Sequence, residues 1–430
     1  MAETSPLRNR HDDYARSLRA LGGGRSGTAP QAGGVISETE AASLLLRAEV
    51  ETIPYGPPDQ STQIVATWGL VEAEYAAIRR GAGLMDRPER GVIRVTGADR
   101  VDFLHRMLTQ DLRGLAAGPA ETARGVRSFW LNRKGRIEAD LLLMARADDL
   151  LIDVDAHLVG PTIQSLGSYA FAEDVVFEDA RQSFHRLSIH GPRAWEVLRW
   201  AGGTPAPPMP APPVGGVWSG EIFGATIHAV RFDDTGEPGF ELFVSRESVV
   251  GAWDALLDSD ASLAEGKRRI RPVGWYAYNI ARIEHGTPLF NVDFGVTELP
   301  HETGIVDQRV SFTKGCYLGQ EVVSRLHHLG RPKQQLVGLR VEGEGLPVAE
   351  AQIFALPESG VVSDAPGPQV GVVTSSTLSP MLGATPIAFG MVRSSHAAPG
   401  TRLVVHAEGA AYAAVVQSLR FWPIEKGTAT

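Results

Sequence analysis

The sequence predicts an α+β protein with a duplicated core and a final domain that is a small antiparallel barrel or sandwich. Three observations predict this class: an internal echo of one strand-helix pattern, a hairpin in each copy, and a late change to short alternating strands. The echo and the hairpins define the core, because strand and helix periodicities alternate there. The final run of short strands, separated by turn residues, defines the last domain.

The echo joins two segments, RVTGADRVDFL at residues 94–104 and SIHGPRAWEVL at residues 188–198. Each has a strand-like start, glycine at the fourth position (Gly97 and Gly191), and then apolar residues at helical spacing. We therefore expect one α+β unit to occur twice.

Each copy is accompanied by a predicted hairpin. The first turns around residues 132–135, and the second turns around residues 233–239, with β-forming residues on both sides. Each returning strand carries one carboxylate among apolar residues, Asp140 in the first and Glu241 in the second. Such a carboxylate lies either on the solvent face of a half-exposed sheet or buried with a partner. If both face one cavity, they could accept hydrogen bonds from a heterocycle or stabilise an iminium cation during one-carbon transfer.

The domain boundaries follow from where these patterns begin and end. Residues 1–50 show little apolar periodicity and are predicted to form a flexible arm. Residues 51–334 contain the duplicated core, with one further helix at residues 274–286. Residues 335–430 alternate in short runs separated by Gly, Pro and Ser, and form the barrel or sandwich.

Composition narrows the class of protein. In 430 residues, 43% are hydrophobic and 21% are charged, and we expect a soluble, cytoplasmic protein that does not bind a membrane. The net charge of −9 argues against nucleic-acid binding, which needs a basic surface. The segment from Arg309 to Arg340 is nevertheless basic, and either meets an anionic ligand or is a solvated face.

Cys316 is the only cysteine. It stands in the run KGCYLGQEVVSR. After it, Val322, Val323, Leu326 and Leu329 have helical spacing, and Gly330 follows them. A thiol just before a helix is either an ordinary packed side chain or a functional thiolate. His327 and His328 are the candidate bases, but adjacent helical residues point about 100° apart, so one at most can face the thiol.

The run from Lys314 to Glu321, with Arg325 after it, resembles the signature of the YgfZ-type folate-binding proteins, relatives of the glycine cleavage T-protein. Other parts resemble the same superfamily: Gly191-Pro192, Thr235-Gly236-Glu237 with Gly239-Phe240-Glu241, Arg282-Ile283-Glu284 with Gly286, and Val373-Thr374-Ser375 with Ser379-Pro380. The resemblance extends from about Val71 to Phe421. It implies a duplicated, ferredoxin-like α+β core and a C-terminal antiparallel β-barrel.

The resemblance also implies a ligand, tetrahydrofolate or a one-carbon-substituted form of it, in a central cavity. Asp140 matches the aspartate beside the reacting folate nitrogens, and Glu241 matches the glutamate at the pterin edge. Cys316 and Asp140 are then the candidate catalytic residues. The candidate cofactor-binding residues are Asp140, Glu241, Lys314, Gly315, Gln320, Glu321 and Arg325.

Two functions compete on this resemblance. The first is a folate-binding accessory protein for assembly or repair of iron-sulfur clusters, whose partners are iron-sulfur proteins or cluster-assembly factors and whose important residue is Cys316. The second is a folate-dependent aminomethyltransferase or demethylase of the T-protein type, for which Asp140 matters most. A scaffold that binds no folate is the third alternative.

The sequence departs from the T-protein pattern at three places. Tyr278-Asn279 replaces the usual Arg-Asp, which predicts the loss of a positive contact to the folate tail. Arg127 stands where T-proteins carry a tyrosine. The segment from Asp86 to Glu89 replaces Asp-Val-Ser-His. These departures count against a faithful aminomethyltransferase.

Overall fold

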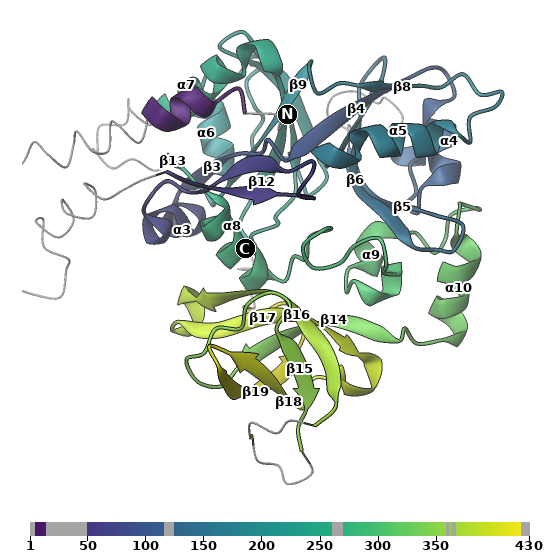
Figure 1. The fold of residues 1–430 in the computed structure, drawn as a ribbon. Helices are drawn as coiled ribbons and strands as arrows, with labels where there is room; N and C mark the ends of the chain where they lie inside the picture. Colours follow the sequence, from purple (N-terminus) through teal and green to yellow (C-terminus); the bar gives the residue numbers. More distant parts are fainter. Residues whose placement is uncertain are drawn as a thin grey trace, which may run out of the picture.

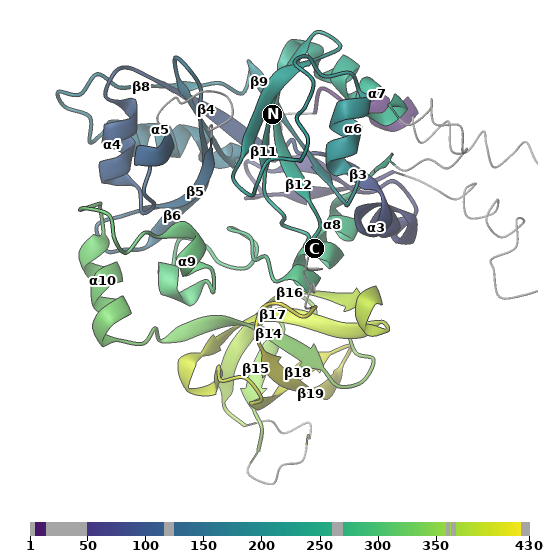
Figure 2. The ribbon, with the colours of Figure 1, turned by 180° about the vertical axis from the view of Figure 1, so that it is seen from behind.

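The computed structural model describes residues 5–13, 50–115, 124–259, 270–357, 362 and 367–422. Figures 1 and 2 show two sheets side by side, with helices on their outer faces, above a small barrel. The predicted α+β core is confirmed. The last domain is a closed barrel of six antiparallel strands rather than a sandwich, in the order β14-β17-β16-β15-β18-β19.

The first copy of the α+β unit is a five-stranded antiparallel sheet in the order β5-β6-β7-β4-β8. Helices α4 and α5 cover one face and share an apolar core with the strands. The elements are β4 (Arg90–Thr96), α4 (Arg100–Met107), β5 (Gly125–Leu131), β6 (Ile137–Ala145), β7 (Leu150–Asp155), α5 (Val159–Gly167) and β8 (Val176–Asp179).

The second copy is a six-stranded sheet in the order β10-β11-β12-β9-β3-β13. Without β3 (Ala82–Asp86), which is inserted next to β9, this order repeats that of the first sheet strand for strand. The other elements are β9 (Phe184–His190), α6 (Ala194–Trp200), β10 (Val217–Ile222), β11 (Ala225–Arg231), β12 (Gly239–Ser245), α7 (Val249–Asp258) and β13 (Ile270–Pro272).

Gly97 and Gly191 occupy equivalent turns and need glycine for the same reason. Their φ angles are +103° and +135°. A Cβ atom would lie 2.1 Å from the Asp174 carbonyl oxygen in the first turn and 2.3 Å from the Gly81 carbonyl oxygen in the second. Neither turn can accept a side chain without moving backbone, so the echo in the sequence reflects a true structural repeat.

Both predicted hairpins form, but they are not equivalent within the repeat. The first joins β5 to β6 through a turn that contains Gly135 (φ +72°). The second joins β11 to β12, which correspond to β6 and β7 of the first sheet. Asp140 and Glu241 therefore lie on strands that are not equivalent in the two copies. The sequence made their positions look equivalent, but the structure shows that they are not.

The remaining elements are the β1-β2 hairpin, four α-helices and the six strands of the barrel. Helix α8, predicted from the sequence, packs against α3, β2 and the barrel strand β16. None of the described helices is long and apolar enough to cross a membrane. These elements are β1 (Glu51–Tyr55), β2 (Thr62–Thr67), α3 (Val71–Arg80), α8 (Trp275–His285), α9 (Val306–Arg309), α10 (Gln320–Leu329), β14 (Gln334–Val341), β15 (Gln352–Ala355), β16 (Gln369–Ser379), β17 (Thr385–Arg393), β18 (Arg402–Ala407) and β19 (Ala410–Gln417).

The N-terminal prediction needs one correction. Residues 5–13, which the sequence assigned to a flexible arm, pack on the second sheet: Leu7 is fully buried in its core. Ser5, His11 and His185 all contact the Asp86 carboxylate, at 2.5, 3.2 and 2.6 Å. Arg10 also forms an ion pair with Asp254, and the His11 ring packs edge-on against Trp68. These contacts anchor a short segment that has no periodic pattern. Most of the predicted arm, residues 14–49, lies outside the described residues.

Candidate active site

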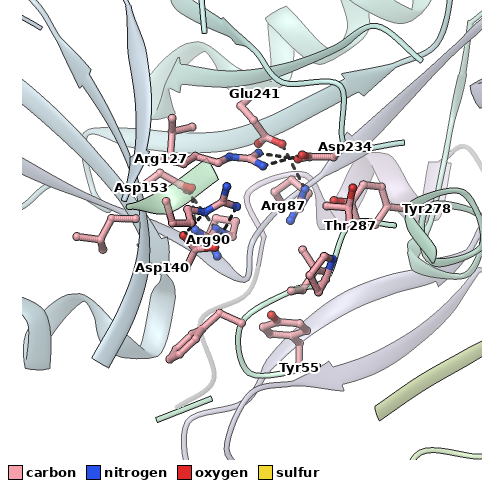
Figure 3. Close-up of a pocket in the computed structure, with 16 residues that line it drawn as sticks. Tyr55, Arg87, Arg90, Arg127, Asp140, Asp153, Asp234, Glu241, Tyr278 and Thr287 are labelled. Atoms are coloured by element: carbon pink, nitrogen blue, oxygen red, sulfur yellow. Dashed lines mark hydrogen bonds and ion pairs between the residues drawn. The ribbon is translucent and has the colours of Figure 1, made fainter. Parts of the chain in front are cut away.

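An inner cavity of about 60 Å³ lies between the two sheets and the loop that follows α8. Figure 3 shows its polar side chains converging from both sheets. Arginines and carboxylates line it in equal number, so their formal charges cancel and the wall favours a neutral polar ligand over a strongly charged one. They are Arg87, Arg90, Arg127, Arg309, Asp140, Asp153, Asp234 and Glu241.

Asp140 and Glu241 reach this cavity because of strand alternation. Successive side chains of a strand point to opposite faces, so Asp140 shares a face with Leu142, and Glu241 shares a face with Phe243. Leu142 and Phe243 belong to one apolar cluster between the two sheets. Both carboxylates therefore point between the sheets, and the solvent-facing alternative is wrong for both.

Asp140 is held by Arg309, the last residue of α9. Arg309 Nε donates to Asp140 Oδ1 at 2.8 Å, and Nη2 donates to Oδ2 at 3.3 Å. The side chain of Arg309 is 5% exposed and that of Asp140 is 15% exposed. A guanidinium in this position fixes the direction of the carboxylate.

Glu241 is held by Arg186, a fully buried arginine of β9. Arg186 Nη2 donates to Glu241 Oε2 at 3.0 Å, and its Nε donates to Asp153 Oδ1 of the other sheet at 2.9 Å. The guanidinium lies 3.8 Å from the centre of the Phe243 ring. Burial disfavours the ionised Asp153, but the charges of Arg186 and Arg90 prevail and lower its pKa. One arginine thus joins the two sheets and positions Glu241.

Arg127 and Asp234 form a second ion pair between the sheets. Arg127 Nη1 and Nη2 donate to the two carboxylate oxygens of Asp234, each at 2.6 Å. Burial alone would raise the pKa of Asp234, but the charge and hydrogen bonds of Arg127 outweigh it and lower the pKa to about 2. This pair is fully ionised at neutral pH.

A larger outer cavity of about 790 Å³ adjoins the inner one. Four residues line both: Arg127, Asp234, Thr287 and Arg309. The outer wall includes Phe232, Ile305 and Leu419, and beside them Arg231 and Arg420. Its volume is within the range of about 300–1,000 Å³ typical of small-molecule sites, whereas the inner cavity alone is far smaller.

The run around Cys316 lies elsewhere. None of Lys314, Gly315, Cys316, Gln320, Glu321 and Arg325 lines the inner or the outer cavity. Cys316 is exposed. His327 stacks on Phe312, with ring centres 3.8 Å apart. Of the residues predicted to bind the cofactor, the structure brings together only Asp140 and Glu241.

Lys314 is buried, and its ammonium group is fully used by the protein. Nζ donates to the carbonyl oxygens of His105, Leu108 and Gln110. Burial lowers the pKa of Lys314 to about 8, so the amine is still mostly protonated at neutral pH. A lysine held in this way connects the run to the end of α4 and has no free donor for a ligand.

Gly319 explains another part of the run. Its φ is +80°, and a Cβ atom there would lie 2.7 Å from the Asn132 carbonyl oxygen. The hairpin turn that precedes Asp140 therefore rests directly on the start of α10. The specific glycine spacing of the run has a structural reason, which is support for the strand that carries Asp140.

The three departures from the T-protein pattern all meet at the inner cavity, since Arg87, Arg127 and Tyr278 line it. Tyr278 is buried, which raises its pKa to about 12, and the Arg87 guanidinium lies 5.2 Å from the centre of its ring. An arginine from the turn before β4 therefore lies beside position 278, where T-proteins carry their own arginine.

Sequence reasoning missed five ionic residues of the site, which are Arg90, Arg186, Asp153, Asp234 and Arg309. Strand alternation could have indicated Asp153, which shares a face with Leu151 of the cluster between the sheets. Arg309 begins the basic segment noted in the sequence, but only the fold shows that it serves Asp140. Among the described residues, no group of three or more His, Cys, Asp or Glu side chains could hold a metal ion.

Comparison with protein families gives two matches. The GCVT N-terminal domain matches residues 54–314, and the glycine cleavage T-protein C-terminal barrel domain matches residues 334–422. The matches cover both copies of the α+β unit and the barrel.

Two similar proteins are both named aminomethyltransferase. An aminomethyltransferase of Streptomyces coelicolor is 30% identical over 338 residues, which are 78% of this chain and 84% of that protein. One of Deinococcus deserti is 28% identical over 398 residues, covering 90% and 97% of the two chains. The crystal structure of the glycine cleavage system aminomethyltransferase T from Bartonella henselae has a TM-score of 0.73 at 24% identity, covering 89% of this chain and 97% of that one.

Proposed function

The chain belongs to the glycine cleavage T-protein family, which uses tetrahydrofolate, and we propose that it is a folate-dependent aminomethyltransferase. This is the second of the two functions that the sequence suggested. The relatives named aminomethyltransferase support it, and they extend over most of the chain.

One observation carries the proposal. Asp140 of the first sheet and Glu241 of the second line the same cavity, although they lie on strands of different copies of the unit. The resemblance to T-proteins implies one carboxylate at the pterin edge and another near the reacting folate nitrogens. The two sheets supply one each.

The residues present fit tetrahydrofolate. The Arg87 Nη1 group is buried and has no hydrogen-bond partner among the described residues, so the wall keeps a donor for a ligand. The outer cavity has the volume for the remainder of such a molecule, and Phe232, Ile305 and Leu419 offer it apolar surface. Arg231 and Arg420 are cations of the same wall that could face its carboxylates.

Tetrahydrofolate supplies the nucleophilic nitrogens that receive the one-carbon unit. The protein supplies a fixed electrostatic environment. Asp140, held by Arg309, presents a carboxylate whose direction cannot drift, and such a group stabilises positive charge that develops at a transferred carbon. The formal charges of the inner wall cancel, so the wall has no large net field. The stabilisation of positive charge by Asp140 therefore acts locally.

The test combines binding and turnover. The full chain is titrated with tetrahydrofolate by calorimetry, and formation of methylenetetrahydrofolate is then followed with an aminomethylated lipoyl carrier and, separately, with N-methylated amines as donors. Binding with turnover on the carrier supports an aminomethyltransferase, and turnover only on the amines supports a demethylase. Absence of both binding and turnover would overturn the proposal and leave the scaffold alternative.

The accessory role in iron-sulfur cluster assembly has less support. It rests on the run from Lys314 to Glu321, and that run lies outside both cavities, where Lys314 and Gly319 have structural roles. The similarity to aminomethyltransferases does not point to such a role. We therefore rank the transferase first.

A further inference from the structure

Arg87 Nη1 and Glu241 Oε1 form an ion pair in the inner cavity but no hydrogen bond with each other. Arg87 Nη1 is 3.8 Å from Glu241 Oε1, which is too long for a hydrogen bond. Arg87 Nη1 has no other partner, and Glu241 Oε1 receives no hydrogen bond from any described residue. The wall thus offers one donor and one acceptor next to each other.

The protein fixes both atoms from behind. Arg87 Nε donates to Glu89 Oε1 at 2.5 Å, the guanidinium lies over the Tyr278 ring, and the Arg87 backbone N–H donates to the Arg186 carbonyl oxygen at 3.1 Å. Glu241 is held through its other oxygen by Arg186. With 6% of Arg87 and 5% of Glu241 exposed, neither side chain can turn toward bulk water.

The chemistry of this pair selects its ligand. A buried donor without a partner is costly, so a ligand that supplies an acceptor gains the full value of that hydrogen bond. An anion is disfavoured, because the Glu241 carboxylate lies beside the donor. A group with a carbonyl oxygen next to an N–H satisfies both atoms at once, since the oxygen accepts from Arg87 and the N–H donates to Glu241.

We propose that Arg87 and Glu241 together read the lactam edge of the ligand, the adjacent C4 carbonyl and N3–H of a 4-oxopteridine, and that Arg87 is a specificity-determining residue of this chain. The inference rests on the proposed folate site. The inference goes beyond the proposed function because it names the residue that recognises the carbonyl. That residue lies at a position where the sequence departs from the T-protein pattern.

The proposal predicts discrimination between two ligands that differ at one position. In the 4-amino-4-deoxy analogue of tetrahydrofolate, the carbonyl oxygen becomes an NH₂ donor that faces the Arg87 donor, and N3 loses its hydrogen and faces the Glu241 acceptor. Both hydrogen bonds are lost. We expect the wild-type chain to bind tetrahydrofolate about ten- to a hundredfold more tightly than this analogue.

The experiment measures dissociation constants of both ligands by calorimetry for the full chain and its variants. Arg87→Met alone would leave the buried Glu89 carboxylate uncompensated, so the main variant is Arg87→Met with Glu89→Gln, and Arg87→Lys is the conservative one. In the double variant the affinity for tetrahydrofolate should fall at least about tenfold and the preference over the analogue should shrink to about twofold. Arg87→Lys, which retains one donor, should keep part of the preference.

The matched control is Arg146→Met. Arg146 also pairs with a carboxylate, that of Asp149, and also lies 5.2 Å from an aromatic ring, that of Phe184, but it lines neither cavity. The Arg146→Met variant should prefer tetrahydrofolate over the analogue as strongly as the wild type does. Equal wild-type affinity for the two ligands, or a folded double variant that keeps the preference, would overturn the inference while leaving folate binding intact. A wild-type chain that binds neither ligand would overturn the proposed function itself, and the inference with it.

Discussion

Arg309 and Asp140 are 169 residues apart in the sequence, yet Arg309 Nε donates to Asp140 Oδ1 at 2.8 Å. The contact joins the short helix before the Cys316 run to the second strand of the first sheet. Arg309 also lines both cavities, so the residue that orients the candidate catalytic carboxylate lies at their boundary.

Asp140→Asn should separate turnover from binding. Asparagine keeps an oxygen that can accept from Arg309 but loses the negative charge that stabilises a developing cation. We expect kcat to fall by about 10²–10³-fold while the dissociation constant of tetrahydrofolate changes by less than about threefold. Steady-state assays and calorimetry measure the two effects.

Glu138→Gln is the control for that substitution, because Glu138 lies on the same strand, bonds to Ser165 and lines neither cavity. Its kcat should match that of the wild type. An Asp140→Asn variant with normal kcat would show that the charge of this carboxylate has no part in catalysis.

Asp234→Asn should destabilise the fold in a pH-dependent way. At neutral pH the substitution leaves Arg127 buried without its counter-charge, which costs about 3–5 kcal/mol. The pKa of Asp234 lies at about 2 in the folded protein, below the ordinary value of 3.8. A carboxylate with a lowered pKa stabilises the fold above its unfolded pKa, and this stabilisation of about 2 kcal/mol disappears as the pH falls from about 4 to about 2.

Urea unfolding of wild type and variant at several pH values checks this prediction. The difference in unfolding free energy should be largest at neutral pH and should narrow in acid. Asp233→Asn, whose ion pair with Arg231 is 27% exposed on the carboxylate side, should cost no more than about 1 kcal/mol. A pH-independent difference for Asp234→Asn would mean that the Arg127 pair does not set its titration.

Local sequence patterns were sufficient to predict the repeat, the hairpins and the two central carboxylates. Gly97 and Gly191 were visible as an echo because both turns require glycine: a Cβ atom at either position would clash with nearby backbone. Asp140 and Glu241 were visible as charges in apolar strands. In each case the signal lies within one strand and its adjoining turn, which is the range over which periodicity carries information.

The partners of those carboxylates could not be predicted in the same way. Arg309 of α9 meets Asp140, and Arg186 meets Asp153 of the other sheet, only once the whole chain has folded. Arg186 meets Glu241 within one sheet, through the pairing of β9 with β12, and that pairing is also long-range. The run around Cys316 posed the opposite difficulty, because it is specific in sequence but lies away from the cavities. Its glycine and lysine are explained by contacts with Asn132 and with the end of α4, which are also long-range.

Lys314→Met should cost stability and leave ligand binding unchanged. The substitution removes a charged donor from three carbonyl oxygens at and just after the end of α4, and we expect a loss of about 2–4 kcal/mol. Urea unfolding measures the loss, and Lys134→Met, at an exposed position of the hairpin turn, is the control. If the folded variant bound tetrahydrofolate more than about tenfold more weakly, Lys314 would regain the ligand role that the sequence suggested.

Cys316→Ala tests whether the exposed thiol takes part in the reaction at all. The side chain is exposed and lines neither cavity, so its removal creates no buried void and removes no contact with a ligand. We expect the dissociation constant for tetrahydrofolate and the rate of aminomethyl transfer to stay within about twofold of wild type. In the native wild-type chain, a maleimide should label one thiol, since Cys316 is the only cysteine, without inhibiting turnover.

The same variant distinguishes the two functions that the sequence left open. In a strain that lacks the native gene, Cys316→Ala should restore folate-dependent aminomethyl transfer as well as the wild type does, because Asp140 and Glu241 are untouched. A variant that is folded and binds folate but fails to restore iron-sulfur enzyme activities, where the wild type succeeds, would contradict the transferase as the whole function. The thiol would then act at the protein surface, on a partner, and outside the cavity between the sheets.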